Sequence, residues 1–191
     1  MQADDANLLV AALGLAYKYL DLGTLRRAFV AVDSAPNGLH LVDALGNEGL
    51  SPARVDKLRR GADLASRLRT DAIYGMVVLR NRLVGGAMLN ACMEESRRSG
   101  YEKNLSQVLI ERGVLTDPLH VAIEGLLAEV VPDLFAKERA LASTIDLEND
   151  SEESAELKLA VLIGEVSAKV SFLNRTDFDA ALMAQEKIAQ G

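Results

Sequence analysis

Residues 74–95 have the sequence YGMVVLRNRLVGGAMLNACMEE, and this stretch decides the fold that we predict. Apolar residues recur at helical spacing on both sides of a short break, which carries a small apolar pair followed by two glycines. The same pattern of helix, tight turn and helix returns over 104–127 and over 163–186. The apolar pairs of the three turns are Leu83–Val84, Val114–Leu115 and Phe172–Leu173. A helix pair of this length cannot bury its apolar face alone, so we expect neighbouring units to stack on one another.

Two constant shifts of the numbering relate these units when the sequence is compared with itself. The first shift takes position 20 to position 84, and it matches Leu20 with Val84, Leu25 with Leu89, Ala28 with Cys92, Phe29 with Met93, Leu41 with Leu105, Leu45 with Leu109 and Gly49 with Gly113. The second takes position 75 to position 164, and it matches Gly75 with Gly164, Leu83 with Phe172, Val84 with Leu173 and Met93 with Leu182. One shift that holds over a whole segment is what an internal duplication predicts, whereas chance apolar matches drift between shifts.

The composition agrees with a helical fold. Of the 191 residues, 49% are hydrophobic but only 4% are aromatic and none is Trp, so the core must consist mainly of Leu, Val, Ala and Met. We therefore predict an all-α protein, a compact bundle of repeated short helix-turn-helix units. The predicted bundle covers 1–145, with units at about 8–64 and 72–130. An acidic linker or loop is expected at 146–157, followed by a C-terminal helix pair at 158–191 that packs on the bundle.

Residues suited to catalysis or metal binding are few and scattered. The single cysteine, Cys92, matches alanines in the other repeats, which favours a small core side chain over a nucleophile. The two histidines, His40 and His120, are far apart, and neither has a second histidine or a cysteine at helical spacing. The chain contains no phosphate-binding loop, dinucleotide fingerprint or nucleophile elbow. We therefore expect a protein that is not an enzyme and that has no cofactor and no metal site.

The charge of the chain is uneven. The formal net charge is −7 and the pI about 4.9, which argues against nucleic-acid binding. Between Arg54 and Lys103, however, the sequence has eleven Lys or Arg and only six Asp or Glu. These cations are either ordinary solvated helix faces or a docking face for an acidic protein partner. The candidate partner-binding residues are Arg54, Lys57, Arg59, Arg60, Arg67, Arg69, Arg80 and Arg82.

The hydropathy pattern gives no sign of a membrane segment. The N-terminal sequence MQADDAN has no basic residue, and the apolar run that follows is too short to span a bilayer. No window of about 20 uncharged apolar residues occurs elsewhere in the chain. We expect a cytoplasmic protein that is not inserted in a membrane, in which a lone thiol stays reduced.

The repeated units also resemble a known family. The segment 162–185 carries Gly164, Leu173, Phe178, Ala181, Leu182 and Gln185, and the segment 104–127 carries Leu105, Leu109, Gly113 and Leu115. This pattern resembles the helical N-terminal domain of type II secretion and type IV pilus assembly ATPases, and similar segments beside kinase domains in bacterial signalling proteins. The resemblance implies an all-α fold and a role in bacterial secretion, motility or kinase signalling.

Some members of that family bind cyclic di-GMP, which the resemblance would place at Gly164, Leu173 and Gln185 in this chain. Those members use a leading arginine at the phosphate, and an arginine suits this task because its guanidinium forms bidentate phosphate contacts. In this chain Ile73, Asn104 and Leu162 stand at that position. A cyclic-dinucleotide sensor with a degenerate site is therefore the alternative function.

Our first hypothesis is a non-enzymatic module for protein–protein interaction, an adaptor or regulatory subunit that binds a protein partner. A further alternative is a self-assembling scaffold subunit. The last helix pair has no following unit to cover its outer face, which would allow a homo-oligomer.

Overall fold

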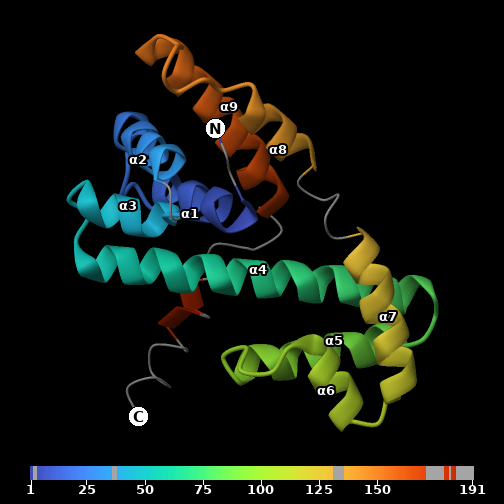
Figure 1. Ribbon diagram of the computed structural model, residues 1–191. Helices are drawn as coiled ribbons and strands as arrows, with labels where there is room; N and C mark the ends of the chain where they lie inside the picture. The colour runs from blue at the N-terminus through green and yellow to red at the C-terminus, as the bar shows by residue number, and fades with distance from the viewer. Residues whose placement is uncertain (2–3, 36–37, 131–135, 171–178, 181, 184–191) are drawn as a thin grey trace. The chain divides into compact units, whose positions relative to one another are not determined.

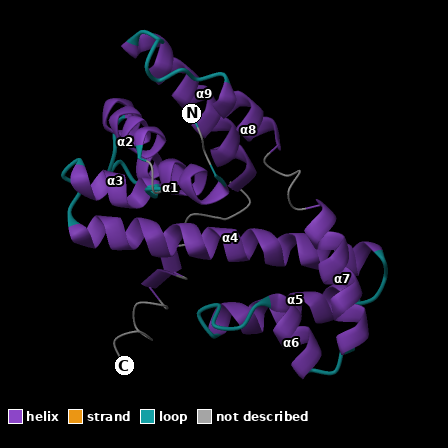
Figure 2. Ribbon diagram, in the orientation of Figure 1, coloured by secondary structure: helices purple, strands orange, loops and turns teal. Residues whose placement is uncertain are grey.

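A computed structural model describes residues 1, 4–35, 38–130, 136–170, 179–180 and 182–183. In these residues every regular element is an α-helix and no strand occurs (Figure 2), which confirms the predicted all-α class. The helices are α1 (Asp5–Ala16), α2 (Leu22–Ser34), α3 (Leu41–Asn47), α4 (Pro52–Arg80), α5 (Gly86–Arg98), α6 (Leu105–Glu111), α7 (Asp117–Val130), α8 (Ala136–Ser143) and α9 (Glu152–Val170). Among the described helices, none combines the length and the apolarity that crossing a membrane requires.

The helices group into two compact units. Unit 1 consists of Met1–Ala65 and Phe135–Phe172, and unit 2 consists of Ser66–Leu134 and Leu173–Gly191. The residues that the sequence placed in one bundle, 1–145, are thus divided between the two units. Much of the expected C-terminal pair, at 171–178, 181 and 184–191, lies outside the described residues.

Helix α4 is longer than the short helices that we predicted (Figure 1). It has 29 residues, and its first part belongs to unit 1 and its last part to unit 2. The sequence around this boundary, SRLRTD at 66–71, contains neither Gly nor Pro, so nothing ends the helix there. The last helix of one repeat therefore continues directly into the first helix of the next.

The backbone repeats at the first of the two shifts, the one that takes position 20 to 84. Under this shift α2 and α3 coincide residue for residue with α5 and α6, and α1 ends where α4 ends. The turns repeat as well. Lys18 and Arg82 have positive φ angles of 56° and 55°, and Gly49 and Gly113 have φ angles of 93° and 66°. Non-glycine residues seldom adopt positive φ, so its recurrence at Arg82 is specific evidence for a duplicated turn.

A buried hydrogen bond repeats at the same shift. The side-chain oxygen of Asn7 accepts a bond from the backbone N–H of Leu41 at 2.9 Å. In unit 2 the carboxylate of Asp71 accepts from Leu105 N–H at 3.0 Å. Each bond satisfies a free N–H at the start of the third helix of its unit and ties that helix to the first. Apolar matches can arise by chance, but a polar contact in the same register supports a true duplication.

The register changes by one position after the third helix. Under the first shift, Pro52 at the start of α4 corresponds to Thr116, whereas α7 begins one position later, at Asp117. The buried Leu58 of α4 corresponds in the same way to Ile123 of α7, one position beyond the shifted one. The turn before α7 is therefore one residue longer than the turn before α4. Helix α7 begins one position later in the sequence but buries the same face.

Two buried positions between the first two helices of each unit differ in residue size, and the two differences compensate each other. A Cβ on Gly14 would lie 2.3 Å from Cδ1 of Leu20, so a larger residue there would require the leucine side chain to shift. At the equivalent positions unit 2 has Val78 and Val84, both buried. A larger residue on the helix is thus matched by a smaller one in the turn, which keeps the core filled.

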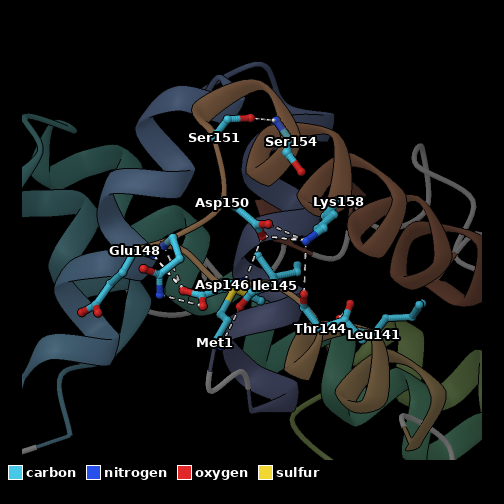
Figure 3. A network of polar contacts seen from close by, with 11 residues as sticks. Met1, Leu141, Thr144, Ile145, Asp146, Glu148, Asp150, Ser151, Ser154 and Lys158 are labelled. Atoms are coloured by element: carbon cyan, nitrogen blue, oxygen red, sulfur yellow. Dashed lines mark hydrogen bonds and ion pairs between the residues drawn. The ribbon is translucent and has the colours of Figure 1, made fainter.

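Helices α8 and α9 complete unit 1, where α9 packs on α1, α2 and α8 (Figure 1). The acidic segment 146–157, expected as a linker or loop, is held in this structure by polar contacts (Figure 3). Asp146 accepts hydrogen bonds from the backbone of Glu148 and Asn149, and the ammonium of Lys158 lies 2.7 Å from Asp150. Residues 152–157 are helical, because Ser151 accepts from the backbone of Ser154 and starts α9.

Candidate helix-binding face

The first four basic candidates lie in unit 1, and each is engaged within it. The guanidinium of Arg54 lies 5.0 Å from the ring centroid of Tyr19, and the ammonium of Lys57 lies 4.9 Å from that of Tyr17. Arg59 and Arg60 form ion pairs of 2.7 and 2.8 Å, the partners being Asp43 and Asp56 respectively. These cations therefore have internal partners, which lowers their availability to another protein.

The other four candidates lie in unit 2 and differ among themselves. Arg67 donates a hydrogen bond of 3.5 Å to the carbonyl oxygen of Tyr101, and Arg69 is only partly exposed. Arg80 ends α4, and Arg82 lies in the turn before α5, where both are exposed. Within the part of the chain that the structure describes, no hydrogen bond or ion pair engages the side chain of either.

The residues of the cyclic-dinucleotide alternative are not brought together by described contacts. Gly164 is exposed on α9, and a Cβ placed there would meet no atom within 4 Å, so it forms no cradle for a ligand. Leu173 and Gln185 lie outside the described residues.

Tyr74 and Cys92, two titratable residues of the unit 2 core, are buried and do not line an open site. The hydroxyl of Tyr74 lies 3.0 Å from Nδ1 of His120, and burial raises the pKa of Tyr74 to about 12. Burial also raises the pKa of Cys92, which favours the thiol over the reactive thiolate. No group of three or more His, Cys, Asp or Glu residues suited to a metal ion occurs in the described residues.

Unit 1 has a shallow hollow of about 280 Å³ beside the acidic turn. It is lined by Met1, Val30, Asp33, Ser34, Ser143, Ile145, Asp146, Leu147 and Glu148. Its acidic side chains are exposed, and those in the turn form local hydrogen bonds that shape the turn itself. These contacts give the hollow a structural role and identify no ligand.

Exposed apolar side chains on the first two helices distinguish unit 2 from unit 1. In unit 1, α9 packs on α1 and α2, and Ala12 and Phe29 on these two helices are 6% and 0% exposed. Their equivalents in unit 2, Met76 and Met93, are 49% and 43% exposed. Leu79, the equivalent of a partly exposed leucine on α1, is 45% exposed. We name the side chains of Met76, Leu79 and Met93 the methionine face.

The methionine face is formed by two adjoining helices. A Cβ on Gly86, at the start of α5, would lie 4.0 Å from Cδ1 of Leu79 on α4. Below this surface Val78, Leu89 and Cys92 are buried in the unit 2 core, so the backbone that carries the face is well supported. Large apolar side chains left exposed on a packed scaffold are typical of an interaction site.

In unit 1, the position of α9 shows where the acidic first turn of a helix lies on the equivalent surface. Glu152, in the first turn of α9, lies 3.5 Å from Arg26 on α2. A Cβ on Gly23 would lie 3.3 Å from the carboxylate of Glu156. The acidic start of α9 is therefore beside the start of α2, near the α1–α2 turn. The equivalent place in unit 2 is the α4–α5 turn, which carries Arg80 and Arg82.

The sequence identified the two arginines but not the apolar side chains. Phe29 and Met93 were matched as equivalent core positions, because both are apolar and the first shift relates them. Their difference in burial depends on the helix that covers one and not the other. No protein-family model, curated protein or solved structure matches this chain.

Proposed function

We propose that this protein is a non-enzymatic interaction module whose methionine face binds an amphipathic helix of a protein partner. One observation carries the proposal: Ala12 and Phe29 are buried in unit 1, where α9 packs on α1 and α2, whereas their equivalents in unit 2 are exposed. The shared hydrogen bonds and turns indicate that both units present a similar surface, so a helix is the shape that suits the exposed one.

The side chains of the face suit such a role. Methionine is unbranched and polarisable, so it adapts to differently shaped apolar partners. Phe29 at the equivalent position is fully buried against its own unit, whereas Met93 is left at the surface. This difference favours an exchangeable partner in unit 2 over a permanent one.

The proposed setting comes from the resemblance to the N-terminal domain of secretion and pilus assembly ATPases. We propose an adaptor or regulatory subunit in a bacterial secretion, motility or kinase-linked system, acting in the cytoplasm. The resemblance rests on the repeated motif, which covers 104–127 and 162–185 in its best-fitting forms.

The α9 sequence itself provides the test. A fluorescently labelled peptide of residues 151–170, SEESAELKLAVLIGEVSAKV, would be titrated with the whole protein and its anisotropy followed. We expect saturable binding, and a loss of at least about tenfold in affinity for the Met76→Lys, Met93→Lys double variant, because two buried charges oppose docking. Val121→Lys is the matched control, since Val121 is 67% exposed on α7 of the same unit. Equal affinity of all three proteins would contradict the proposal.

Self-association is a second candidate, favoured by one observation on α9. Leu157 and Val161 are 67% and 53% exposed on this helix, whereas Leu159 and Leu162 are buried. Helix α9 thus carries a second apolar surface, in addition to the one that packs on α1 and α2. A second copy of the chain could cover it.

A further inference from the structure

We infer that the helix bound by the methionine face has an acidic first turn and lies with its N-terminus at the α4–α5 turn, beside Arg80 and Arg82. This inference rests on the proposed function and specifies the chemistry and direction of the partner helix.

The direction follows from the occupied surface in unit 1. The acidic first turn of α9 lies beside the start of α2, as the contact between Glu152 and Arg26 shows. Acidic residues at the start of a helix are also stabilised by the positive end of its own dipole. A helix placed on unit 2 in the same orientation would begin beside the start of α5.

The charge follows from what unit 2 carries at that place. Arg80 and Arg82 stand where unit 1 has Ala16 and Lys18, and Asn90 stands in place of Arg26. Unit 2 thus keeps the cation in the turn, gains one at the end of α4 and lacks the one on the helix. In the described residues neither Arg80 nor Arg82 has an ion-pair partner, whereas Arg97 and Arg98 on the same α5 both pair with Glu94. Two exposed cations beside an apolar face complement a helix that begins with carboxylates.

The experiment compares two peptides and three proteins at low ionic strength. The peptides are residues 151–170 and the same sequence with Glu152→Gln, Glu153→Gln and Glu156→Gln. The proteins are the wild type, the Arg80→Glu, Arg82→Glu variant and the Arg54→Glu, Lys57→Glu variant. The last changes the net charge equally but in unit 1. Thermal melting of each variant, followed by circular dichroism, verifies that it is folded.

We expect the Arg80→Glu, Arg82→Glu variant to bind the acidic peptide about tenfold more weakly, because exposed ion pairs are individually weak but two are reversed. The neutral peptide should lose much less, and about 0.5 M salt should reduce the difference between the two peptides. The Arg54→Glu, Lys57→Glu variant should bind both peptides as the wild type does.

The outcomes separate this inference from the proposed function. If the wild type binds both peptides equally, or if Arg80→Glu, Arg82→Glu weakens both to the same extent, the acidic first turn is overturned while helix binding stands. If Arg54→Glu, Lys57→Glu has the larger effect, the acidic end docks on unit 1 and the assigned place beside Arg80 and Arg82 is wrong. If the wild type binds neither peptide, the proposed function fails, and this inference fails with it.

Discussion

At the scale of single residues, the two units use different side chains, an amide and a carboxyl group, to accept the same backbone hydrogen bond. Asn7 and Asp71 both accept the free N–H at the start of the third helix, but only Asp71 can ionise. Its burial raises the pKa of the carboxyl from 3.8 to about 6, although the bond from Leu105 and the charge of Arg67 oppose the shift. Asn7, a neutral acceptor at the equivalent place, avoids the cost of burying a charge.

The first prediction concerns Asp71→Asn. The folded carboxyl holds its proton up to about pH 6, while the unfolded one loses it near 3.8, so the folded state binds more protons in this window. The stability of the wild type should therefore fall as the pH rises from about 4 to 6 and remain low above it. Asp71→Asn should remove this fall and raise the free energy of unfolding at pH 8 by on the order of 1–2 kcal/mol, reduced by the remaining solvent exposure of the side chain.

Urea denaturation of both proteins at pH 4 and at pH 8 measures this difference. The Asn7→Asp variant is the converse control, because it should introduce the same pH dependence into unit 1. A variant Asp71→Asn that is less stable than the wild type at pH 8 would show that the ionised carboxylate is stabilising.

At the scale of helices, the third helix of each unit begins with a different cap. Asn104 accepts from the backbone of Gln107, whose side chain in turn accepts from the backbone of Asn104, so α6 begins with a complete capping box. In unit 1 the equivalent residue is His40, which forms no side-chain cap although its backbone is extended in the same way. Helix α3 thus lacks the side-chain cap of α6, and the backbone N–H of Asp43 donates instead to the carbonyl oxygen of His40 at 3.0 Å.

The second prediction is that His40→Asn stabilises the protein. The asparagine side chain should accept from the backbone of Asp43 and raise the free energy of unfolding by about 0.5–1 kcal/mol, the typical gain from a good N-cap. Asn104→Ala should lower it by about 1 kcal/mol for the converse reason. Equilibrium denaturation followed by circular dichroism measures both effects, and His40→Ala controls for the loss of the imidazole. No gain over His40→Ala would indicate that the start of α3 does not limit stability.

At the scale of the whole molecule, each unit exposes large apolar side chains among the described residues, and one such surface in each unit carries a proposal. The methionine face lies in unit 2, and the outer surface of α9, with Leu157 and Val161, lies in unit 1. Large exposed side chains of this kind are associated with interaction or aggregation. The two surfaces can be tested separately because each unit has its own core.

The third prediction concerns the surface of α9. We expect light scattering of the wild type to show an average mass that rises above 20.6 kDa with concentration, and Leu157→Asp, Val161→Asp to remain at the mass of one chain. The reason is that buried carboxylates oppose an apolar contact between copies. Met76→Lys, Met93→Lys should self-associate as the wild type does. A wild type that keeps the mass of one chain at every concentration would exclude this contact.

Helical class and duplication could be predicted from the sequence because both depend on local order. The periodicity of Leu, Val and Ala specifies helices, and constant spacing of matched residues preserves a copied unit whatever its neighbours are. The glycine at 113 and the breaker before α7 likewise act within a few residues of themselves. Even the joining of two repeats into α4 has a local cause, the absence of Gly and Pro over 66–71.

The candidate site depended on contacts between distant residues. Arg54 and Arg80 are chemically alike in the sequence, yet Arg54 lies over Tyr19 while no described residue pairs with Arg80. Phe29 and Met93 occupy matched positions, yet only Phe29 lies in the unit that α9 covers. By itself the sequence determined the helical class and the repetition of the unit, because these follow from spacing along the chain. Only the tertiary structure decided which cations are engaged and which apolar face stays open, because burial depends on the element that packs there.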